Sequence, residues 1–230
     1  MSLLVLIGCS GPVPAPAPVR VLVFTRTAGF RHDSIPAGVA AIRDLGTTGG
    51  YQVDATDDAG AIGTANLRRY RAVVFLSTTG DLLDSAQQQA LEGYVEGGGG
   101  FVGVHAAADA EYGWPFYGQL VGAWFASHGA VEPGRIEVVD RRHPATAQLG
   151  ATWTRTDEWY SFRSRPQAHV LLRLDADHPL AWCHVVGSGR SFYTALGHPV
   201  AAFAEPALRA HLQGAIRWAA GLVPADCGTE

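Results

Sequence analysis

The sequence repeatedly places a short apolar run directly before a segment with helical periodicity. These runs are RVLVFT (20–25), YQVDAT (51–56), AVVFLS (72–77) and FVGVH (101–105). Short β-branched runs of this kind are typical of buried parallel strands, and the helices between them supply the crossover connections. The alternation therefore predicts an α/β fold with a doubly wound, mainly parallel sheet.

Three helices are expected between and after these strands. Asp33 or Ser34 can cap the first, which carries Ile35 and Ile42 on one face and should end at Gly46. The second lies in LDSAQQQALEGYVEGGGG and the third in AEPALRAHLQGAIRWAAGL. Each has an apolar stripe at helical spacing, so each is expected to pack on the sheet.

The alternation stops in residues 135–175, where RIEVV, WTRT and AHVLLRL favour strands and helical periodicity is weak. We expect an antiparallel excursion or a lid here. The segments PLAWCHVV and RSFYTAL, joined by Gly-Ser-Gly, predict a hairpin that returns the chain to the sheet. The expected organisation is one domain over residues 19–222 with a tail at 223–230.

Composition excludes several functional classes. The chain has 230 residues, is 47% hydrophobic and carries a net charge of −4, so it has ample core and no basic footprint for nucleic acid. All 17 basic residues are arginine, which excludes Schiff-base and phosphate-loop chemistry that depends on lysine. No stretch is long enough to span a membrane.

The N-terminus suggests export. LLVLIGC (3–9) resembles a bacterial lipoprotein cleavage box, and GPVPAPAPV (11–19) predicts an extended tether. The run is short and nothing basic precedes it, so it is an incomplete signal peptide. We expect residues 1–18 to be a lipoprotein leader and tether, which makes the protein an exported, membrane-anchored lipoprotein. Without that leader it would be cytoplasmic.

The three cysteines are too few and too scattered for a disulfide framework or a cysteine-rich zinc site. Cys183 lies in the strand-like run LAWCHVV and is expected to be a buried thiol. A bridge from Cys183 to Cys227 is the alternative if the compartment is oxidising.

Polar residues follow several strands at the points where each strand ends. They are His32 after the first, Asp81 after the third, His105 and Asp109 after the fourth, and His198 after RSFYTAL. The carboxyl ends of parallel strands share one edge of the sheet, where ligands bind in open α/β folds. The sequence therefore predicts one site there. The alternative is structural, since His32 with Asp33 can cap a helix and Asp81 suits a turn.

His105 stands where FVGVH meets AAAD, a sharp strand-to-helix turn at which related architectures place a nucleophile. His105 and Asp109 are spaced i, i+4, so Asp109 is expected to share a helix face with His105 and to orient it. A purely structural hydrogen bond between them is the alternative.

Carbohydrate chemistry is suggested by WTRTDEWYSF (153–162), where Asp157 and Glu158 lie among aromatic residues such as Trp159. Sugar faces stack on aromatic rings, and a carboxylic acid near an apolar wall can act as an acid. A packed antiparallel turn with solvated acids is the alternative. His128, in WFASHG, is expected to follow an aromatic helix and to lie at a loop that can reach the site. His184 can face the site or the core. The remaining histidines are expected to be solvated: His143, His169, His178 and His211.

The longest motifs resemble the trehalose-utilisation (ThuA-like) family. They are GFRHDSIPAG, VVFLSTTGDLLD, GGGFVGVHAAADAEYGWPFYGQLVGAWFASH, HPAT, TDEWYSF and GRSFYTALGHP, and the resemblance runs from about residue 20 to residue 221. The resemblance implies a flavodoxin-like fold similar to class I glutamine amidotransferases. It also implies a role in disaccharide use around 3-keto sugar derivatives.

Amidotransferases of that fold place a cysteine on the elbow and a His-Pro-Glu after a late strand. Here His105 occupies the elbow, and His198 is followed by Pro199 and Val200. Thiol-based glutamine hydrolysis is therefore excluded. Histidine exchanges protons near neutral pH, so a pair of histidines can serve as acid and base, and it can equally bind a divalent metal such as zinc.

We therefore expect a hydrolase or lyase-like enzyme that acts on a small carbohydrate, a disaccharide or its 3-keto derivative. The catalytic candidates are His105, His198, Asp109 and Glu158, and the substrate-binding candidates are His32, Asp81, His128, Asp157 and Trp159. The metal candidates are His105 and His198. The alternative function is a non-catalytic sugar-binding or partner-binding module that kept the fold.

Deleting residues 1–18 should leave the melting temperature almost unchanged, because a leader and tether lose no buried contact. Thermal denaturation of the full and shortened chains tests this expectation. A drop of many degrees would mean that the segment packs on the domain.

Overall fold

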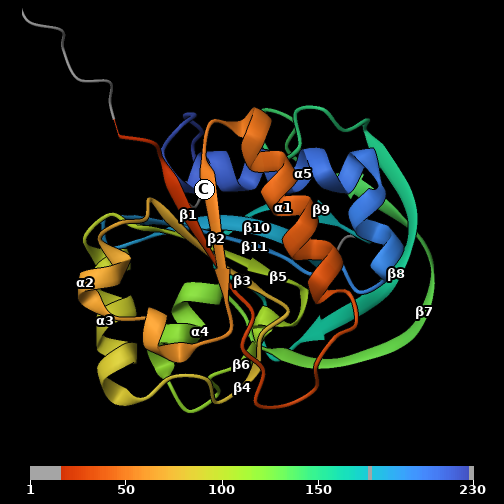
Figure 1. Cartoon of the computed structure of the whole chain (residues 1–230). Coiled ribbons are helices and arrows are strands. Elements are labelled where there is room, and N and C mark those ends of the chain that lie inside the picture. Colours follow the sequence, from red (N-terminus) through yellow and green to blue (C-terminus); the bar gives the residue numbers. More distant parts are fainter. Residues whose placement is uncertain (1–16, 176–177, 228–230) are drawn as a thin grey trace, which may run out of the picture.

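One continuous sheet of nine strands crosses the molecule (Figure 1). The structure is a computed structural model that describes residues 17–175 and 178–227. Nearly all of the predicted leader, including Cys9, lies outside these residues. The order of the strands in the sheet is β2-β1-β3-β5-β11-β10-β9-β7-β8.

The first half of the sheet is parallel and confirms the predicted doubly wound core. Its strands are β1 (Arg20–Phe24), β2 (Gln52–Thr56), β3 (Ala72–Leu76), β5 (Gly100–Val104) and β11 (Gly189–Thr194). Every residue of β3 and β5 is buried. Continuous apolar sequence suits strands that have helices on both faces.

Helices cover both faces of this sheet (Figure 1). On one face lie α1 (Ile35–Gly49) and α5 (Pro206–Ala219). On the other lie α2 (Thr64–Leu67), α3 (Ser85–Glu96) and α4 (Pro115–Val121), of which α2 was not predicted. The apolar stripes of the long helices therefore pack on the sheet as expected.

Helix α1 differs from the prediction at both ends. Ser34 is the N-cap residue, but its side chain makes no capping hydrogen bond. The helix continues through Gly46 and ends at Gly50, whose φ of 82° lies in the left-handed region. A Cβ on Gly46 would lie 2.7 Å from the carbonyl oxygen of Tyr51, so this glycine is needed for close packing rather than as a stop. Gly50 can end the helix there because glycine adopts a positive φ without a steric penalty.

The predicted antiparallel excursion is an extension of the same sheet and not a separate lid. Four strands continue from β11, each antiparallel to its neighbours: β10 (Pro179–Val186), β9 (His169–Arg173), β7 (Phe125–Val138) and β8 (Thr152–Phe162). The two long strands β7 and β8 curve along one side of the molecule, beside α5, towards the ends of the parallel strands (Figure 1).

Strand β7 includes the segment around His128 that was expected to be a loop after an aromatic helix. Glycine and proline in this segment disfavour a strand. Pairing with β8 nevertheless holds it extended, with an irregular register between His128 and Val131. Long-range pairing therefore overrides the local propensity here.

A small second sheet ties the loops together at the carboxyl edge of the parallel strands. It consists of β4 (Thr79–Gly80) and β6 (Asp109–Ala110), which pair in parallel. Thr79 also forms an isolated bridge with Thr27, and its hydroxyl donates to the carbonyl oxygen of Phe30 at 2.8 Å. The loops that follow β1, β3 and β5 are therefore held side by side.

Cys183 is not a free thiol, because it forms a disulfide with Cys227. The chain reverses after α5, and the indole nitrogen of Trp218 donates to the carbonyl oxygen of Ala225 at 3.2 Å. That reversal brings Cys227 onto β10. The bridge joins residues 44 apart in the sequence, a contact that local sequence patterns do not reveal.

His143 and His211 were expected to be solvated, but both are buried. Nδ1 of His211 donates to the carbonyl oxygen of Ala145 at 2.8 Å, while Nδ1 of His143 accepts from the amide of Ala145 at 3.1 Å. Burial lowers the pKa of His143 to about 3 and that of His211 to about 4. Both are therefore neutral parts of the core.

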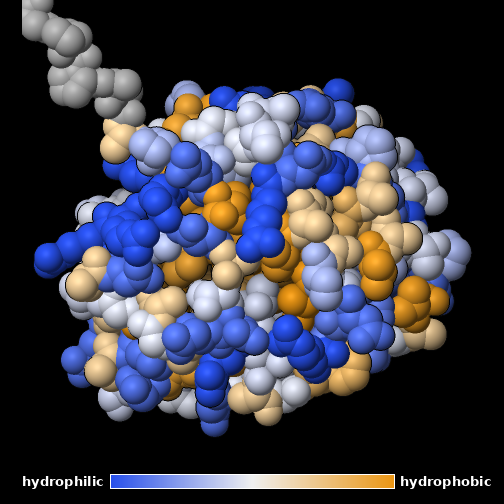
Figure 2. All heavy atoms as spheres, in the orientation of Figure 1, coloured by the Kyte–Doolittle hydropathy of each residue, from blue (hydrophilic) through white to orange (hydrophobic). Residues whose placement is uncertain are grey.

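The outer surface is mixed in character. Figure 2 shows hydrophilic side chains over much of one face, with hydrophobic side chains gathered across the middle of the view, from the region of β2 past the lower part of α1. Within the described part of the chain, no helix has the length and hydropathy needed to cross a membrane. The apolar surface of the helices is used mainly for packing on the sheet.

The free energy of unfolding should fall as the pH falls below ~6.5, the ordinary pKa of histidine in the unfolded chain. Below that pH, His143 and His211 bind protons in the unfolded state but stay neutral in the folded state, because their folded pKa values are about 3 and about 4. Each histidine should remove about 2 kcal/mol between pH ~7.5 and pH ~5. Urea unfolding at both pH values checks this, and His211→Gln should show a smaller pH dependence than the wild type. An equal dependence in the variant would contradict the assignment.

Candidate functional site

His105 occupies a strained turn at the end of β5. Its φ is 52°, one of three positive values among the non-glycine residues of the described chain. A non-glycine residue in the left-handed region costs on the order of 1–3 kcal/mol and persists where the surrounding structure enforces it. A 3₁₀ turn, His105–Ala108, follows at once. The predicted sharp strand-to-helix turn is therefore present, and it presents the imidazole at the carboxyl edge of the sheet.

Two hydrogen bonds fix the tautomer of His105. Its Nδ1 lies 2.8 Å from the carbonyl oxygen of Ala195, which can only accept, so Nδ1 carries the proton. Nε2 therefore has a lone pair, to which the hydroxyl of Tyr160 donates at 3.2 Å. The side chain is fully buried, and this burial, followed by the nearby His32, holds the pKa of His105 well below its ordinary value. His105 is thus neutral with Nε2 directed into the site.

His198 enters the site from the loop after β11. Gly197 has a φ of 118°, which allows the amides of Gly197 and His198 to point at one carboxylate, that of Asp157. They donate to it at 3.0 and 3.1 Å. Nδ1 of His198 then lies 3.3 Å from Nε2 of His105. The side chain is 28% exposed, which makes His198 the histidine of this pair that solvent and ligands can reach.

Asp157 is fully buried and forms an ion pair with Arg155 at 3.1 Å. Its oxygens are directed at the backbone of the His198 loop. The structure therefore places Asp157 as a positioning residue, whereas the sequence had suggested a contact with substrate.

Glu158 lies between three histidines. Its Oε2 is 3.5 Å from Nε2 of His105 and 3.2 Å from Nδ1 of His198, and its Oε1 is 3.1 Å from Nδ1 of His128. His128 reaches it from β7 and has 45% of its side chain exposed, while Glu158 has only 7% exposed. The carboxylate is therefore held in a nearly buried position with one histidine on its outer side.

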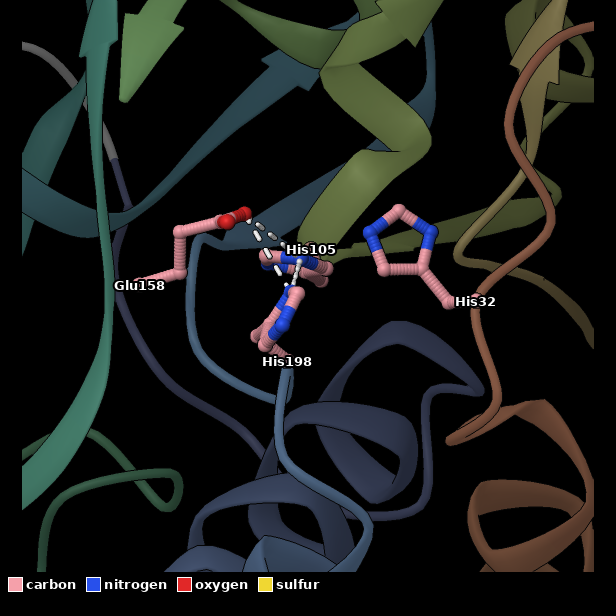
Figure 3. A group of neighbouring side chains, drawn as sticks. All are labelled: His32, His105, Glu158 and His198. Atoms are coloured by element: carbon pink, nitrogen blue, oxygen red, sulfur yellow. Dashed lines mark hydrogen bonds and ion pairs between the residues drawn. The ribbon is translucent and has the colours of Figure 1, made fainter. Parts of the chain in front are cut away.

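His32 closes the cluster from the opposite side, as Figure 3 shows. Its ring lies edge-on to His105 and His198, with centroids 4.7 and 5.4 Å away. Burial, and then the proximity of His198, lowers the pKa of His32 to about 4, so this ring is also neutral. One ligand atom from each of His32, His105, Glu158 and His198 lies within 4.8 Å of the others.

Three of the predicted site residues do not join this cluster within the described structure. Asp109 accepts from the hydroxyl of Tyr112 at 2.6 Å and makes no hydrogen bond to His105, because the 3₁₀ turn removes the expected i, i+4 alignment. Asp81 is exposed in the turn after β4 and forms no hydrogen bond or ion pair with the histidines. Trp159 is buried, packs against Gly134 and donates to the carbonyl oxygen of Glu132 at 3.1 Å.

Two aromatic residues at the site were not selected from the sequence. Tyr160 is two residues after Glu158, so strand alternation places both on the same face, and this spacing could have identified it. Phe30 is 68% exposed and its ring meets that of His32 edge-on, with centroids 4.8 Å apart. Its only signal in the sequence is its position two residues before His32.

The fold and the site together define the class. The protein is an α/β protein of the class I glutamine amidotransferase-like type, in which a histidine occupies the nucleophile elbow. No thiol is available in the described core, because Cys183 and Cys227 are joined to each other. The chain belongs to the trehalose utilisation family (ThuA), which it matches over residues 20–219.

Solved structures agree with this assignment. A ThuA-like protein from Bacteroides uniformis is 24% identical, with a TM-score of 0.75 over 91% of this chain and 95% of that one. A ThuA-like protein from Parabacteroides merdae is 22% identical, with a TM-score of 0.77 over 93% and 98% of the two chains. A β-galactosidase from Bacillus circulans is 14% identical, with a TM-score of 0.61 over 88% of this chain and 31% of that one. No curated protein matches the sequence. Membership of the family supports a carbohydrate-related role.

Asp157→Asn should lower the free energy of unfolding by about 3–5 kcal/mol, because it leaves the buried guanidinium of Arg155 without its main counter-charge. Glu205 remains as a partner at 3.5 Å but is half-exposed. Chemical denaturation measures the loss, and the exposed Asp81→Asn is the matched control. The double variant Asp157→Asn/Arg155→Met should recover part of the loss. Equal stability of the two single asparagine variants would contradict the role given to Asp157.

Proposed function

We propose that the protein is an enzyme that cleaves the glycosidic bond of a disaccharide or its 3-keto derivative, by hydrolysis or by elimination. The observation that carries this proposal is the cluster of His105, His198 and Glu158, whose side chains contact each other in a nearly buried position. A structural role would be met by one hydrogen bond. Here three titratable side chains converge at the sheet edge where open α/β folds bind ligands.

The division of labour among these residues follows from their exposure and partners. His198 is the partly exposed member, so it can reach a substrate proton and hold it against Glu158 at 3.2 Å. Tyr160 has its pKa raised, by burial first and then by the carboxylate of Glu158, so its hydroxyl stays protonated as a donor. His105 receives that hydrogen bond and keeps a single tautomer. In this proposal His198 therefore exchanges a proton with the substrate, while the hydroxyl of Tyr160 keeps its proton and acts only as a hydrogen-bond donor.

These groups suit an elimination on a 3-keto sugar. The carbonyl at C3 acidifies the hydrogen on C2, which His198 removes as the general base. The electron pair of that C–H bond forms the C1–C2 double bond, and the C1–O bond breaks. The leaving oxygen takes a proton from the acid form of a neighbouring group, and later addition of water across the double bond completes a net hydrolysis. Glu158 stabilises the imidazolium that forms on His198.

Two features support a carbohydrate as the substrate. Phe30 offers an exposed aromatic face beside His32, and aromatic faces stack on the apolar faces of sugar rings. The same fold also forms part of the β-galactosidase chain from Bacillus circulans. With the family membership, these features favour a sugar over a peptide or a nucleotide.

We also propose that the protein is exported and anchored through a lipid on Cys9. The bridge between Cys183 and Cys227 supports this proposal, because disulfides persist mainly in oxidising compartments.

The test is incubation of the purified protein with native and 3-keto disaccharides, with the released monosaccharides measured by chromatography. Glu158→Gln and His198→Ala should each lower kcat by about 10²–10⁴-fold if they take part in proton transfer. His169→Gln, which changes a histidine paired with Asp140 away from the cluster, should retain full activity. Tight binding of a sugar without any turnover would instead identify a non-catalytic sugar-binding module.

A further inference from the structure

We propose that His32, His105, His198 and Glu158 bind one divalent transition-metal ion, zinc or an ion of similar chemistry. The inference rests on the site of the proposed function, and it concerns metal binding that can be measured with or without turnover. Figure 3 shows the four side chains converging from four separate segments of the chain.

The distances match a metal site. A tetrahedral ion with bonds of ~2.0–2.1 Å holds its ligand atoms about 3.3–3.4 Å apart. Nε2 of His105 lies 3.3 Å from Nδ1 of His198, and Oε2 of Glu158 lies 3.5 and 3.2 Å from these two nitrogens. His32 completes a group whose ligand atoms are all within 4.8 Å. The triangle of His105, His198 and Glu158 therefore has the edges of one face of a tetrahedron.

The state of the donor atoms also fits. Nδ1 of His105 donates to the carbonyl oxygen of Ala195, so the lone pair of its Nε2 points at the other ligands. Glu158 contributes a carboxylate oxygen to the same point. Several lone pairs directed at one another repel, and hydrogen bonds from Tyr160 and one proton on His198 relieve this only in part. A cation satisfies all of them at once.

The residues around the ligands form the supporting layer that metal sites require. Metal-binding histidines donate their second nitrogen to a carbonyl or carboxylate, as His105 does to Ala195. The remaining oxygen of Glu158 faces His128 at 3.1 Å. Asp157 holds the backbone of His198, and the positive φ of His105 fixes its ring at the strand end. These contacts therefore orient His105, His198 and Glu158 before an ion binds.

A second group in the described residues has metal-binding residue types, but two of its three side chains cannot act as ligands. His143 lies near Cys183 and Cys227, whose sulfur atoms are already joined to each other. Thiolate ligation is therefore unavailable there. Of the two groups, the one made of His32, His105, Glu158 and His198 therefore has donor atoms that are free to bind a metal.

The types of donor atom limit which metal ions the site would bind. Three imidazoles and one carboxylate suit zinc, iron, manganese or nickel and disfavour calcium and magnesium, which prefer oxygen ligands. When bound, such an ion would polarise a carbonyl or hydroxyl oxygen of the sugar. Phe30 contacts His32 and His128 contacts Glu158, so both flank the ligands and would border a fifth coordination position, which a sugar oxygen would have to take because the four protein donors fill a tetrahedron.

The experiment uses the full chain, purified without a histidine tag and dialysed against a chelator. Titration with Co²⁺ should give one equivalent of bound ion and the visible absorption of a four- or five-coordinate nitrogen-rich site, and Zn²⁺ should displace it. His198→Ala and Glu158→Gln should each weaken binding by at least about tenfold. The control His169→Ala removes a histidine paired with Asp140 and should leave binding unchanged.

Wild type that binds Co²⁺ no better than His198→Ala and Glu158→Gln would overturn the proposal. So would binding that falls equally in His169→Ala. Because His198 is partly exposed, its variant should fold, and circular dichroism of each variant confirms this. The experiment distinguishes the two proposals. Stoichiometric metal binding without sugar turnover would contradict only the proposed function. Sugar turnover by chelator-treated, metal-free protein that also binds no Co²⁺ would contradict only the metal-binding proposal.

Discussion

The site depends on one buried carboxylate. Asp157 lies in the antiparallel half of the sheet, yet it accepts the two amides of the loop that follows the parallel strand β11. Hydrogen bonds to a charged group contribute about 1.5–3 kcal/mol each, and Arg155 offsets the cost of burying the charge. This link joins the His198 loop of the parallel half directly to strand β8 of the antiparallel half. With it, Glu158 and Tyr160 from β8 meet His105 and His198 at a fixed separation.

The topology explains why such a link is needed. In a doubly wound sheet the loops after β1, β3, β5 and β11 all reach one edge, which brings His32, His105 and His198 together. Among the described residues, the loops at that edge supply histidine nitrogens but no carboxylate hydrogen-bonded to them. The long, curved pair of strands β7 and β8 brings in Glu158 from outside the parallel core, with His128 beside it. The antiparallel extension is thus the part of the fold that adds a carboxylate to the cluster of histidines.

The sequence predicted those features that arise from local physics. The buried strands, the capped helix α3 and the hairpin β10–β11 depend on periodicity and turn residues, and they lie where expected. The elbow at His105 and the convergence of three histidines followed from strand ends alone. Features set by long-range pairing could not be predicted. The extension of β8 through Glu158 decides that Trp159 faces the core, and the 3₁₀ turn after His105 separates Asp109 from it. The chain reversal that joins Cys227 to Cys183 has no local signal at all.

Proton transfer and metal binding, the two uses proposed for the cluster, are compatible only under one condition. When a metal is bound, a residue other than His198 must accept the proton from the substrate. An ion on Nδ1 of His198 and Oε2 of Glu158 would occupy the lone pairs that proton transfer requires. Oε1 of Glu158 would remain free, and it faces His128 at 3.1 Å. His128 is the most exposed histidine of the group and contacts none of the proposed ligands except Glu158. If both proposals hold, His198 would accept the substrate proton in the metal-free site, and His128 would accept it in the metal-bound one. The outer position of His128 on β7 then has a chemical reason, because the strand that carries it runs beside the strand that carries Glu158.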